Sequence, residues 1–421
     1  MFSRAADHRS GFGRLGHQAE GFPQCGACDK YSLALANLLA GNGSAPNMAG
    51  LEYTLAGPTV QADDYTLVAL AGGVSRPKVN GKDAPMFAPI LLAPDDTLEI
   101  GALESGLRGY LALFGGLNIQ PVLGSRSTDL KCHIGGMEGR ALRAGDALPV
   151  LSAFRLPQEQ YALMQKRFKP LEPWMLSTLT PHGYIGDASL PLLRIVPGPQ
   201  DGMFTEQALH EFSHSLYAVT PDSNRMAAKL SGTAVEAKNG VDILSDGIVE
   251  GSVQISANGQ PIVMLADHQS TGGYAKIGTV ISCDIPALAQ VRPGQSVGFR
   301  FVTVEEGIAA CKREKEKMES VQGAVLWRII SLRCPRRRCV RSSARAKSHS
   351  RRPACATAMR RAISSSCPKS WHGIFCSFAS ATPNPVRCWR SRTPAAEPSP
   401  YSAREAISRA TFRNTASMKT A

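Results

Sequence analysis

The stretch Pro261-Ile-Val-Met-Leu-Ala-Asp-His-Gln-Ser-Thr-Gly-Gly-Tyr-Ala-Lys-Ile-Gly-Thr-Val-Ile281 places polar residues between two apolar runs. Both runs, 261–266 and 277–281, have the composition of β-strands. Polar side chains on a loop that two rigid strands hold are typical of a binding or catalytic site. We therefore predict a strand, a loop and a second strand here, with a functional site on the loop.

This loop carries hydrogen-bonding side chains, a cation, an aromatic ring and two residues without Cβ. Glycine can take positive φ, so a ligand or another chain can approach the backbone closely there. The alternative is a tight turn whose polar side chains satisfy the loop backbone. Such a turn needs one or two polar residues, so the larger number favours a site. The residues singled out are Asp267, His268, Gln269, Thr271, Gly272, Gly273, Tyr274 and Lys276.

A second polar loop lies in the first half of the chain and contains Ser125, Arg126, Ser127, Thr128 and Asp129. A guanidinium binds anions through two parallel hydrogen bonds, and hydroxyls and a carboxylate lie within the same five residues. The alternative is a structural ion pair between Arg126 and Asp129 at a barrel rim. Ser223 and Arg225 form a weaker third patch.

The net charge of +13 is unevenly distributed along the 421 residues. Residues 331–421 hold 19 Lys and Arg against 2 Asp and Glu, so the remaining body is mildly acidic. The basic excess therefore does not indicate a nucleic-acid-binding body. Cysteines are scattered, and neither a secretory leader nor an apolar run of about 20 residues occurs. We expect a soluble cytoplasmic protein without membrane contact.

The pattern along the body is mainly β, or α+β. Short β-like runs follow one another without long helices between them, which favours barrels or sandwiches. Two short helices are expected, at 31–40 after the N-cap Asp29 and at 205–212 after the N-cap Thr205, and a third, charged helix is expected at 305–319. We predict two barrel-like subdomains, at 11–150 and 151–318. The predicted strands are 51–55, 65–70, 87–92, 97–100, 108–114, 193–196, 217–219, 243–244, 251–255, 261–265, 277–281 and 297–304.

Residues 319–421 form a basic tail of Arg, Ser, Ala, Pro and Cys. That composition cannot build a core, so we expect disorder. Translation in the wrong reading frame explains the mixture better than an RNA-binding tail, because aromatic residues are sparse.

Ordered motifs run through the body: Gly-Ala-Cys-Asp29, Ala-Asn-Leu-Leu-Ala-Gly-Asn42, Leu-Glu-Tyr-Thr-Leu-Ala-Gly-Pro58, Phe-Gly-Gly116, Leu-Gly-Ser-Arg-Ser-Thr-Asp129, Val-Pro-Gly-Pro-Gln200, Leu-Ser-Asp-Gly-Ile248 and Ala-Asp-His-Gln-Ser-Thr-Gly-Gly-Tyr274. Together they closely resemble the biotin-dependent carboxyltransferase family, also called allophanate hydrolase subunit 2, over residues 11–306. The resemblance implies cyclophilin-like β-barrels and a working complex with a homologous protein of the allophanate hydrolase subunit 1 type, the B component.

Stand-alone members of this family include the C component of ATP-dependent 5-oxoprolinase, which also needs an A component. That enzyme converts 5-oxoproline, ATP and water to glutamate, ADP and phosphate, and the resemblance implies this activity here. One alternative is the carboxyltransferase of a urea carboxylase or allophanate hydrolase system, with biotin as the cofactor. The other is a non-enzymatic regulatory partner of a protein of the B-component type.

Opening a lactam with ATP requires cations for the phosphates, donors for developing oxyanions and a carboxylate that positions water. We assign these catalytic roles to Arg126, Asp129, Asp267 and Lys276. The other residues of the three patches are expected to bind substrate. His268 suits proton transfer near neutral pH, but family members often carry Arg there, which implies contact with an anion.

Metal and nucleotide motifs are weak in this chain. Cys25-x-x-Cys28 has a redox or half-zinc spacing but no second ligand pair in the body. His210 and His214 share a helix face without a third ligand in view. No Gly-x4-Gly-Lys-Ser/Thr loop occurs, so we expect no metal and an ATP site of another kind or in a partner protein.

Overall fold

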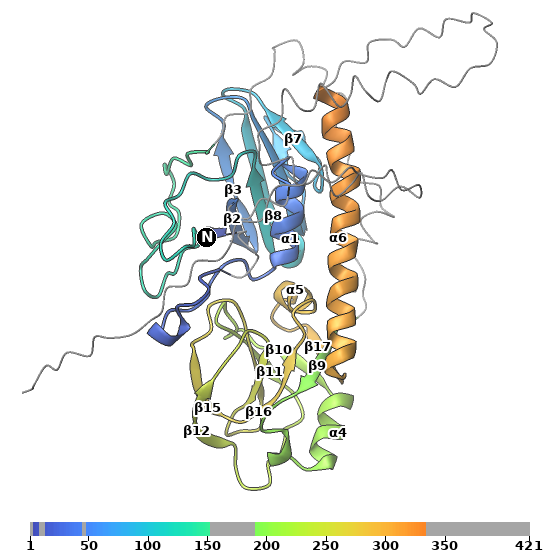
Figure 1. Cartoon of the computed structure of the whole chain (residues 1–421). Helices are drawn as coiled ribbons and strands as arrows, with labels where there is room; N and C mark the ends of the chain where they lie inside the picture. Colours follow the sequence, from blue (N-terminus) through green and yellow to red (C-terminus); the bar gives the residue numbers. More distant parts are fainter. Residues whose placement is uncertain (1–2, 8–12, 44–47, 152–189, 334–421) are drawn as a thin grey trace, which may run out of the picture. The chain divides into compact units, whose positions relative to one another are not determined.

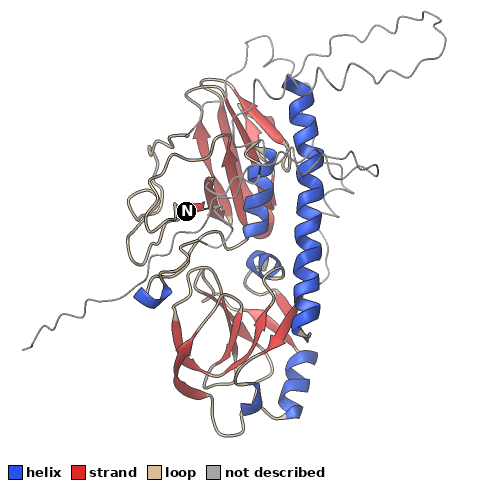
Figure 2. Cartoon of the chain, viewed as in Figure 1, coloured by secondary structure: helices blue, strands red, loops and turns tan. Residues whose placement is uncertain are grey.

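Most of the regular structure in the computed structural model is β-strand, which confirms the predicted mainly β class (Figures 1 and 2). The structure describes residues 3–7, 13–43, 48–151 and 190–333. All of them belong to one compact unit, Met1–Arg338. The predicted tail beyond residue 333 and the connector residues 152–189 lie outside the described part of the chain.

The first half forms an eight-stranded sheet that curls into a half-barrel. Its main path runs β1-β2-β8-β4-β7, while β3 pairs with β8, and β5 pairs with both β6 and β8. The strand bounds are Ser3–Asp7 (β1), Ala49–Thr54 (β2), Ala56–Gln61 (β3), Thr66–Ser75 (β4), Lys78–Val79 (β5), Lys82–Asp83 (β6), Pro89–Leu92 (β7) and Thr97–Leu113 (β8).

Side chains along β4 alternate between the two faces of this sheet, and each face carries its own hydrophobic core. Ala69 and Ala71 point to the face that helix α1 (Lys30–Leu39) covers, and Val68 and Leu70 point to the opposite face. Successive strand residues face opposite sides, so one strand serves both layers. Small alanines on the α1 side allow the helix to pack close to the sheet.

The second half is a closed barrel with the strand order β10-β11-β14-β13-β16-β9-β17. All neighbouring pairs are antiparallel except β9 and β17, which pair in parallel, and β17 pairs with β10 to close the ring. Closure leaves no free sheet edge in the barrel. The strand bounds are Leu192–Pro197 (β9), Leu216–Val219 (β10), Ala227–Ser231 (β11), Ser252–Ile255 (β13), Pro261–Met264 (β14), Lys276–Val280 (β16) and Ser296–Phe301 (β17).

Helix α4 (Glu206–His214) covers the barrel near β17 (Figure 1). The Phe212 ring stacks on Phe299 at a centroid distance of 4.6 Å. Thr205 caps the helix by accepting a hydrogen bond from the N–H of Ala208, as predicted. A buried aromatic pair of this kind adds about 1 kcal/mol beyond the area that it buries.

Helix α5 (Ile285–Gln290) joins the two halves through the side chain of Gln290 and through the carbonyl of Ala289, which accepts a hydrogen bond from Arg108. Gln290 Oε1 accepts hydrogen bonds from the N–H groups of Leu107 and Arg108, at 3.0 and 3.1 Å. Its Nε2 donates to Asp29 at 2.7 Å. The Gln290 amide therefore provides hydrogen-bond partners for buried backbone N–H groups that water does not reach.

Several elements differ from their prediction, and strands β1, β3, β5, β6 and β11 and helix α5 were not predicted at all. The two strands predicted at 97–100 and 108–114 form one strand, β8, in which Gly101 and Gly106 take positive φ. Residues 271–274, predicted as loop, form strand β15 (Thr271–Tyr274), which pairs with β12 (Asp242–Gly247). The partner strand is distant in sequence, so local composition did not reveal this ribbon.

Helix α6 (Val304–Arg333) continues past the predicted boundary at residue 318. The added residues 319–333 contain no proline, the residue that disrupts a helix most strongly. No helix within the described residues is both long enough and apolar enough to span a bilayer.

Candidate active site

The loop that leads into α1 is attached to both halves of the chain. The N–H of Cys25 donates to the carbonyl of Ala266, next to the predicted polar loop, at 2.9 Å. Asp29 caps α1 by accepting from the N–H of Ser32 at 2.9 Å, as predicted. Cys25 has a φ of 59°, which residues with a Cβ rarely adopt. Backbone in this region is found mainly where surrounding contacts hold it, often beside functional sites.

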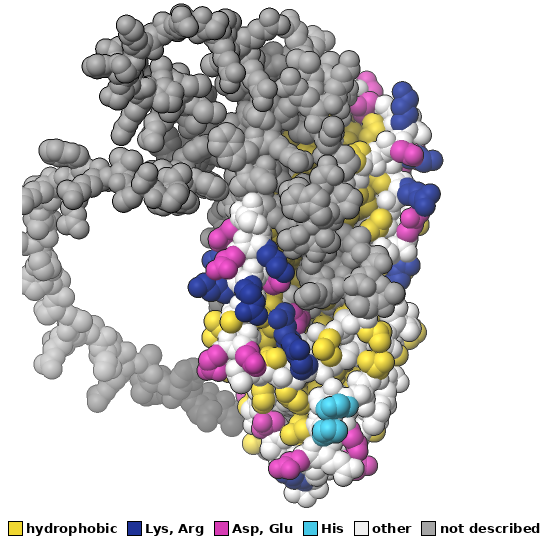
Figure 3. Space-filling view, turned by 90° about the vertical axis from the view of Figure 1, so that its right-hand side faces the viewer, with side chains coloured by type: hydrophobic (Ala, Val, Ile, Leu, Met, Phe, Trp, Pro, Cys, Tyr) yellow, Lys and Arg dark blue, Asp and Glu magenta, His cyan; other side chains and the backbone are white. Residues whose placement is uncertain are grey.

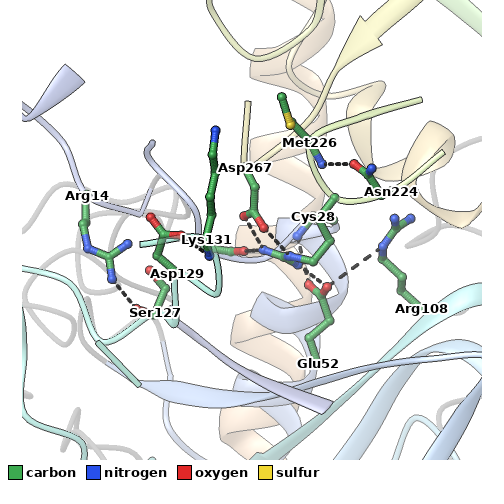
Figure 4. Close-up of polar contacts among 12 residues, drawn as sticks. Arg14, Cys28, Glu52, Arg108, Ser127, Asp129, Lys131, Asn224, Met226 and Asp267 are labelled. Carbon is green, nitrogen blue, oxygen red and sulfur yellow. Dashed lines mark hydrogen bonds and ion pairs between the residues drawn. The ribbon is translucent and has the colours of Figure 1, made fainter. Parts of the chain in front are cut away.

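Arg225 connects a carboxylate of each half. Its Nε and Nη2 donate to the two carboxylate oxygens of Asp267, at 3.0 Å each. Its Nη1 pairs with Glu52 on β2, and Nη2 also reaches the carbonyl of Gly26 (Figure 4). The two-pronged contact fixes the carboxylate plane of Asp267. Arg225, assigned to a weaker patch from the sequence, therefore lies at the centre of the junction.

Glu52 is a structural anion in this network, with 2% of its surface exposed. Its Oε2 accepts hydrogen bonds from the N–H of Cys28 at 3.0 Å and from the hydroxyl of Tyr110 at 2.9 Å. Burial alone would raise the pKa of Glu52, but the guanidinium groups of Arg225 and Arg108 outweigh it and hold the pKa below its usual value. Glu52 is therefore ionised at neutral pH.

The Ser125–Asp129 loop has a carboxylate oxygen that the fold does not use. Asp129 Oδ1 accepts from the N–H groups of Lys131 and Cys132, at 2.9 and 3.0 Å. Its Oδ2 is buried and has no hydrogen-bond partner among the described residues. An unsatisfied buried polar atom is costly, so it points to a group that the free chain lacks.

The neighbours of Asp129 are held tightly. The hydroxyls of Ser125 and Ser127 are 2.7 Å apart. Arg126 donates from Nε to the carbonyl of Ile119 at 2.8 Å. Thr128 Oγ1 lies where a Cβ on Gly136 would be only 1.7 Å away, so this position admits only glycine. The loop is thus a rigid support for the Asp129 carboxylate.

The two predicted loops meet at Cys25. Burial raises the pKa of the Cys25 thiol, Asp267 and Asp129 raise it further, and Arg14 and Arg225 lower it. Electrostatic effects of this kind require short distances. Asp129 of the first half and Asp267 of the second therefore both lie near Cys25, in the region where Figure 4 shows Arg14, Asp129 and Asp267. We call Arg14, Cys25, Asp129, Asp267, His268 and Gln269 the junction cluster.

His268 and Gln269 add two more unsatisfied atoms to this cluster. His268 is 1% exposed, and its Nδ1 lies 2.7 Å from the carbonyl oxygen of Gln269, so Nδ1 carries the proton. Its Nε2 and the Oε1 of Gln269 are buried without a hydrogen-bond partner in the described ranges. Asp129 Oδ2, His268 Nε2 and Gln269 Oε1 are thus acceptors that a ligand could use, and Nε and Nη1 of Arg14, also buried without a partner among the described residues, are donors.

The hydrogen bonds and the ion pair described for Lys276 are made to residues outside this cluster. Lys276 is on β16, 4% exposed, and pairs with Asp246 of β12. Its Nζ also donates to the carbonyl of Gly247 at 2.8 Å. Both partners belong to the β12 strand rather than to the junction cluster. The catalytic role assigned to Lys276 remains a prediction.

The glycines and the tyrosine of the predicted loop have structural roles in the β12–β15 ribbon. A Cβ on Gly272 would lie 2.4 Å from Ile248 Cδ1, so this glycine allows close packing. Tyr274 packs against the barrel core, and Gln254 Nε2 donates to its carbonyl at 3.1 Å. Thr271 is exposed. Substrate-binding roles for Thr271, Gly272, Gly273 and Tyr274 also remain predictions.

Ser223 stabilises a turn and borders a pocket. Its Oγ accepts from the N–H of Lys229 at 3.0 Å and donates to the carbonyl of Lys229 at 3.1 Å. Ser223, Glu52 and Arg225 line a pocket of about 350 Å³ whose other walls are mostly apolar. Arg225 therefore borders both this pocket and the junction cluster.

Three residues of the site were not singled out from the sequence: Arg14, Cys25 as a polar-cluster member, and Glu52. Glu52 had a local signal, since it is a carboxylate within the apolar run 51–55. Arg14 had none beyond its glycine-rich surroundings. Their roles depend on partners more than 100 residues away in the chain, such as Ser127 for Arg14 and Arg225 for Glu52.

Metal binding finds no support in the described ranges, where no group of three or more His, Cys, Asp or Glu could hold an ion. Burial raises the pKa of Cys28 to about 11, and that of Cys25 is raised as well, so both thiols stay protonated at neutral pH. The rings of His210 and His214 stack at a centroid distance of 4.0 Å, and both side chains are exposed. Figure 3 shows a group of histidine side chains on the molecular surface.

Comparison with known proteins agrees with the described fold. A family model described as carboxyltransferase domain, subdomain A and B, matches residues 20–301. The chain is 32% identical to the C subunit of 5-oxoprolinase from Escherichia coli (strain K12) over 75% of its own length and 94% of that protein. It is also 32% identical to the C subunit of 5-oxoprolinase from Haemophilus influenzae, over 72% of its own length and 90% of that protein.

More distant similarity extends to larger proteins. The urea amidolyase of Saccharomyces cerevisiae is 27% identical over 76% of this chain, which spans only 17% of that protein. The solved structure of TTHA0988 has a TM-score of 0.57 and 31% identity, covering 71% of this chain and 54% of that one. The Kluyveromyces lactis urea amidolyase structure has a TM-score of 0.65 at 24% identity, covering 76% and 19%. Because its sequence identity is only 24%, the similarity to the Kluyveromyces lactis structure supports the fold alone.

Proposed function

Because the chain belongs to the carboxyltransferase domain family, subdomains A and B, we propose that it is one component of an ATP-dependent 5-oxoprolinase. The reaction is the conversion of 5-oxoproline, ATP and water to glutamate, ADP and phosphate. The similarity to the C subunits of two 5-oxoprolinases over nearly their whole length supports this choice. The observation that carries it is the junction cluster, with its buried and unsatisfied donors and acceptors.

The junction cluster suits the chemistry of lactam opening. A lactam presents a carbonyl oxygen that needs donors and a ring N–H that needs an acceptor. Asp129 Oδ2 is a buried acceptor with no other task in the described fold. A carboxylate at that position can also orient the attacking water once the lactam oxygen is activated. Asp129 is therefore our first candidate for direct contact with the reacting atoms.

Asp267 has a different part in this proposal. Both of its carboxylate oxygens accept hydrogen bonds from Arg225, which keeps the side chain oriented. Asp267 supplies negative charge beside Cys25 and places the following residues His268 and Gln269. Arg126 and Lys276 are proposed to contact phosphate oxygens, either directly or after the partner proteins bind.

Partner proteins complete the proposed enzyme. The relatives from Escherichia coli and Haemophilus influenzae are named as C subunits of 5-oxoprolinase, and we propose that this chain acts with a homologous B component and with an A component. The chain has no phosphate-binding loop of the Gly-x4-Gly-Lys-Ser/Thr type. We therefore place the main ATP contacts in a partner or at a shared interface.

A carboxyltransferase of a biotin-dependent urea carboxylase is the second candidate. The fungal urea amidolyase relatives favour it, but this chain spans less than a fifth of their length. Carboxyl transfer from biotin needs preorganised donors for a ureido oxygen, and the junction cluster offers these too. The distinction therefore requires substrates rather than geometry.

The deciding experiment measures glutamate formation from 5-oxoproline and ATP by the full chain mixed with its cognate A and B components. Urea with carboxybiotin is run alongside, and a mixture without this chain is the control. We expect turnover of 5-oxoproline that stops when the chain is omitted. Turnover of urea alone would assign the carboxyltransferase function instead. If neither substrate is turned over and the B component still binds, the chain would be a regulatory partner of that component.

A further inference from the structure

Arg14 is a buried cation whose side chain the fold satisfies only in part. Its relative exposure is 0%, and it is among the largest fully buried side chains of the described chain. One terminal nitrogen, Nη2, donates to the carbonyl of Ser127. Nε and the other terminal nitrogen, Nη1, have no hydrogen-bond partner among the described residues. A buried guanidinium whose Nε and Nη1 lack acceptors destabilises the fold unless an anion or another acceptor binds to these two nitrogens.

The unsatisfied atoms of Arg14 lie in the junction cluster. The N–H of Arg14 donates to the carbonyl of Gln24, next to Cys25, at 2.7 Å, and its Nη2 donates to the carbonyl of Ser127, two residues before Asp129. Figure 4 shows Arg14 and Asp129 next to one another beside Ser127. The described residues contain no ion pair between Arg14 and a carboxylate. The cluster thus presents a free cation and a free carboxylate oxygen side by side.

This pairing selects the chemistry of the ligand. A group with an anionic oxygen satisfies Arg14, and an N–H close to that oxygen satisfies Asp129 Oδ2. A phosphate fits poorly, because it would set a dianion against the Asp129 carboxylate. An α-amido carboxylate can satisfy both Arg14 and Asp129 Oδ2, because its carboxylate group is attached to the carbon that bears the N–H.

We propose that Arg14 binds the carboxylate of the lactam substrate while Asp129 accepts its ring N–H, so that Arg14 determines specificity for a carboxylated lactam. This inference rests on the proposed function. 5-Oxoproline has this arrangement, with the carboxylate one carbon from the ring nitrogen. Two contacts on neighbouring substituents fix the ring orientation, which leaves the lactam carbonyl free to face the activating phosphate.

A glycine-rich segment, residues 133–139, packs against Arg14. A Cβ on Gly135 would lie 2.5 Å from Arg14 Nη2, so this segment rests directly on the guanidinium. His133 and Glu138 in the same segment have φ of 55° and 56°. Backbone at positive φ is held in place by the surrounding contacts and is found mainly beside functional sites.

The test combines truncation of the side chain with truncation of the substrate. The full chain with its cognate A and B components is assayed on 5-oxoproline and on 2-pyrrolidinone, the same lactam without the carboxylate. The wild type is expected to prefer 5-oxoproline by about 100-fold in kcat/KM, the size typical of a buried charged pair. Arg14→Met is expected to remove this preference, and Arg14→Lys to retain part of it. Arg194→Met, which breaks a partly buried ion pair with Asp284 in the second half, serves as the matched arginine control and should keep the full preference.

The outcomes separate this inference from the function on which it rests. If the wild type turns over neither lactam, the proposed function is wrong. If it turns over both, and Arg14→Met lowers both equally, Arg14 only supports the Ser127 carbonyl and the inference is overturned. Circular dichroism reports whether the variants fold. If they do not, the wild-type substrate ratio decides, and a preference below about tenfold overturns the inference.

Discussion

Replacement of Arg225 by methionine tests the network that joins the two halves. Arg225 pairs with Glu52 and Asp267, whose side chains are 2% and 17% exposed. Methionine keeps most of the length of arginine but leaves Glu52 buried without its main counterion. Removing one partner of a buried pair costs about 3–5 kcal/mol. We expect about 3 kcal/mol here, the lower end of that range, because Arg108 remains 4.0 Å from Glu52.

The assay is urea unfolding of the full chain at pH 7, followed by circular dichroism. Arg76→Met is the matched control, since Arg76 pairs with Glu104 at the surface with 81% of its side chain exposed. An exposed pair contributes about 0–1 kcal/mol, so this control should lie near the wild type. The double variant Glu52→Gln/Arg225→Met should be less destabilised than the sum of the two single changes, because a neutral amide needs no counterion.

A small effect would contradict this account of the network. If Arg225→Met unfolds within about 1 kcal/mol of the wild type, then water or the remaining hydrogen bonds already stabilise Glu52, and Arg225 does not hold the halves together. An additive double variant would also count against direct coupling between the two side chains.

Three further predictions concern pH, the α5 contact and the predicted cation sites. The pKa of Glu52 is lowered in the folded chain, so its charge stabilises the fold above the ordinary pKa near 4.5, and this stabilisation is lost as the pH falls below that value. The urea midpoint of Glu52→Gln should therefore approach that of the wild type as the pH is lowered from 7 to 3. A difference between the two midpoints that stays constant with pH would count against a charged Glu52 in the fold. Gln290→Leu should destabilise the chain by about 2–4 kcal/mol in the same assay, because it leaves buried N–H groups unsatisfied; a neutral result would mean that water replaces the amide. Lys276→Ala and Arg126→Ala should abolish 5-oxoproline turnover without loss of the circular dichroism signal, and unchanged turnover in both would exclude them from the site.

Local patterns in the sequence predicted most of the elements. The helix at 31–40 and the helix at 205–212 were placed by their caps, and Asp29 and Thr205 make the expected hydrogen bonds to backbone three residues ahead. These interactions lie within one turn, so neighbouring residues suffice to predict them. The strands 261–264 and 276–280 likewise follow from β-branched and apolar composition around a polar loop.

Prediction was less complete where pairing decides the structure. Residues 271–274 look like a loop because they contain two glycines, yet hydrogen bonds to β12 make them a strand. β8 looks like two strands because glycines interrupt it, yet β2, β3 and β4 pair along its length. Such pairing satisfies backbone groups whatever the local propensity, so it overrides composition.

Local residue patterns were enough to predict the mainly β class, the two capped helices and the polar loops at 125–129 and 267–270. Which members of these loops meet depends on contacts between distant parts of the chain. Those contacts bring Asp129 and Asp267 to Cys25, pair Lys276 with the β12 strand instead, and add Arg14 as a buried cation. Caps and alternation act between residues a few positions apart, whereas burial and charge depend on partners that the closed barrel and the curled sheet bring together.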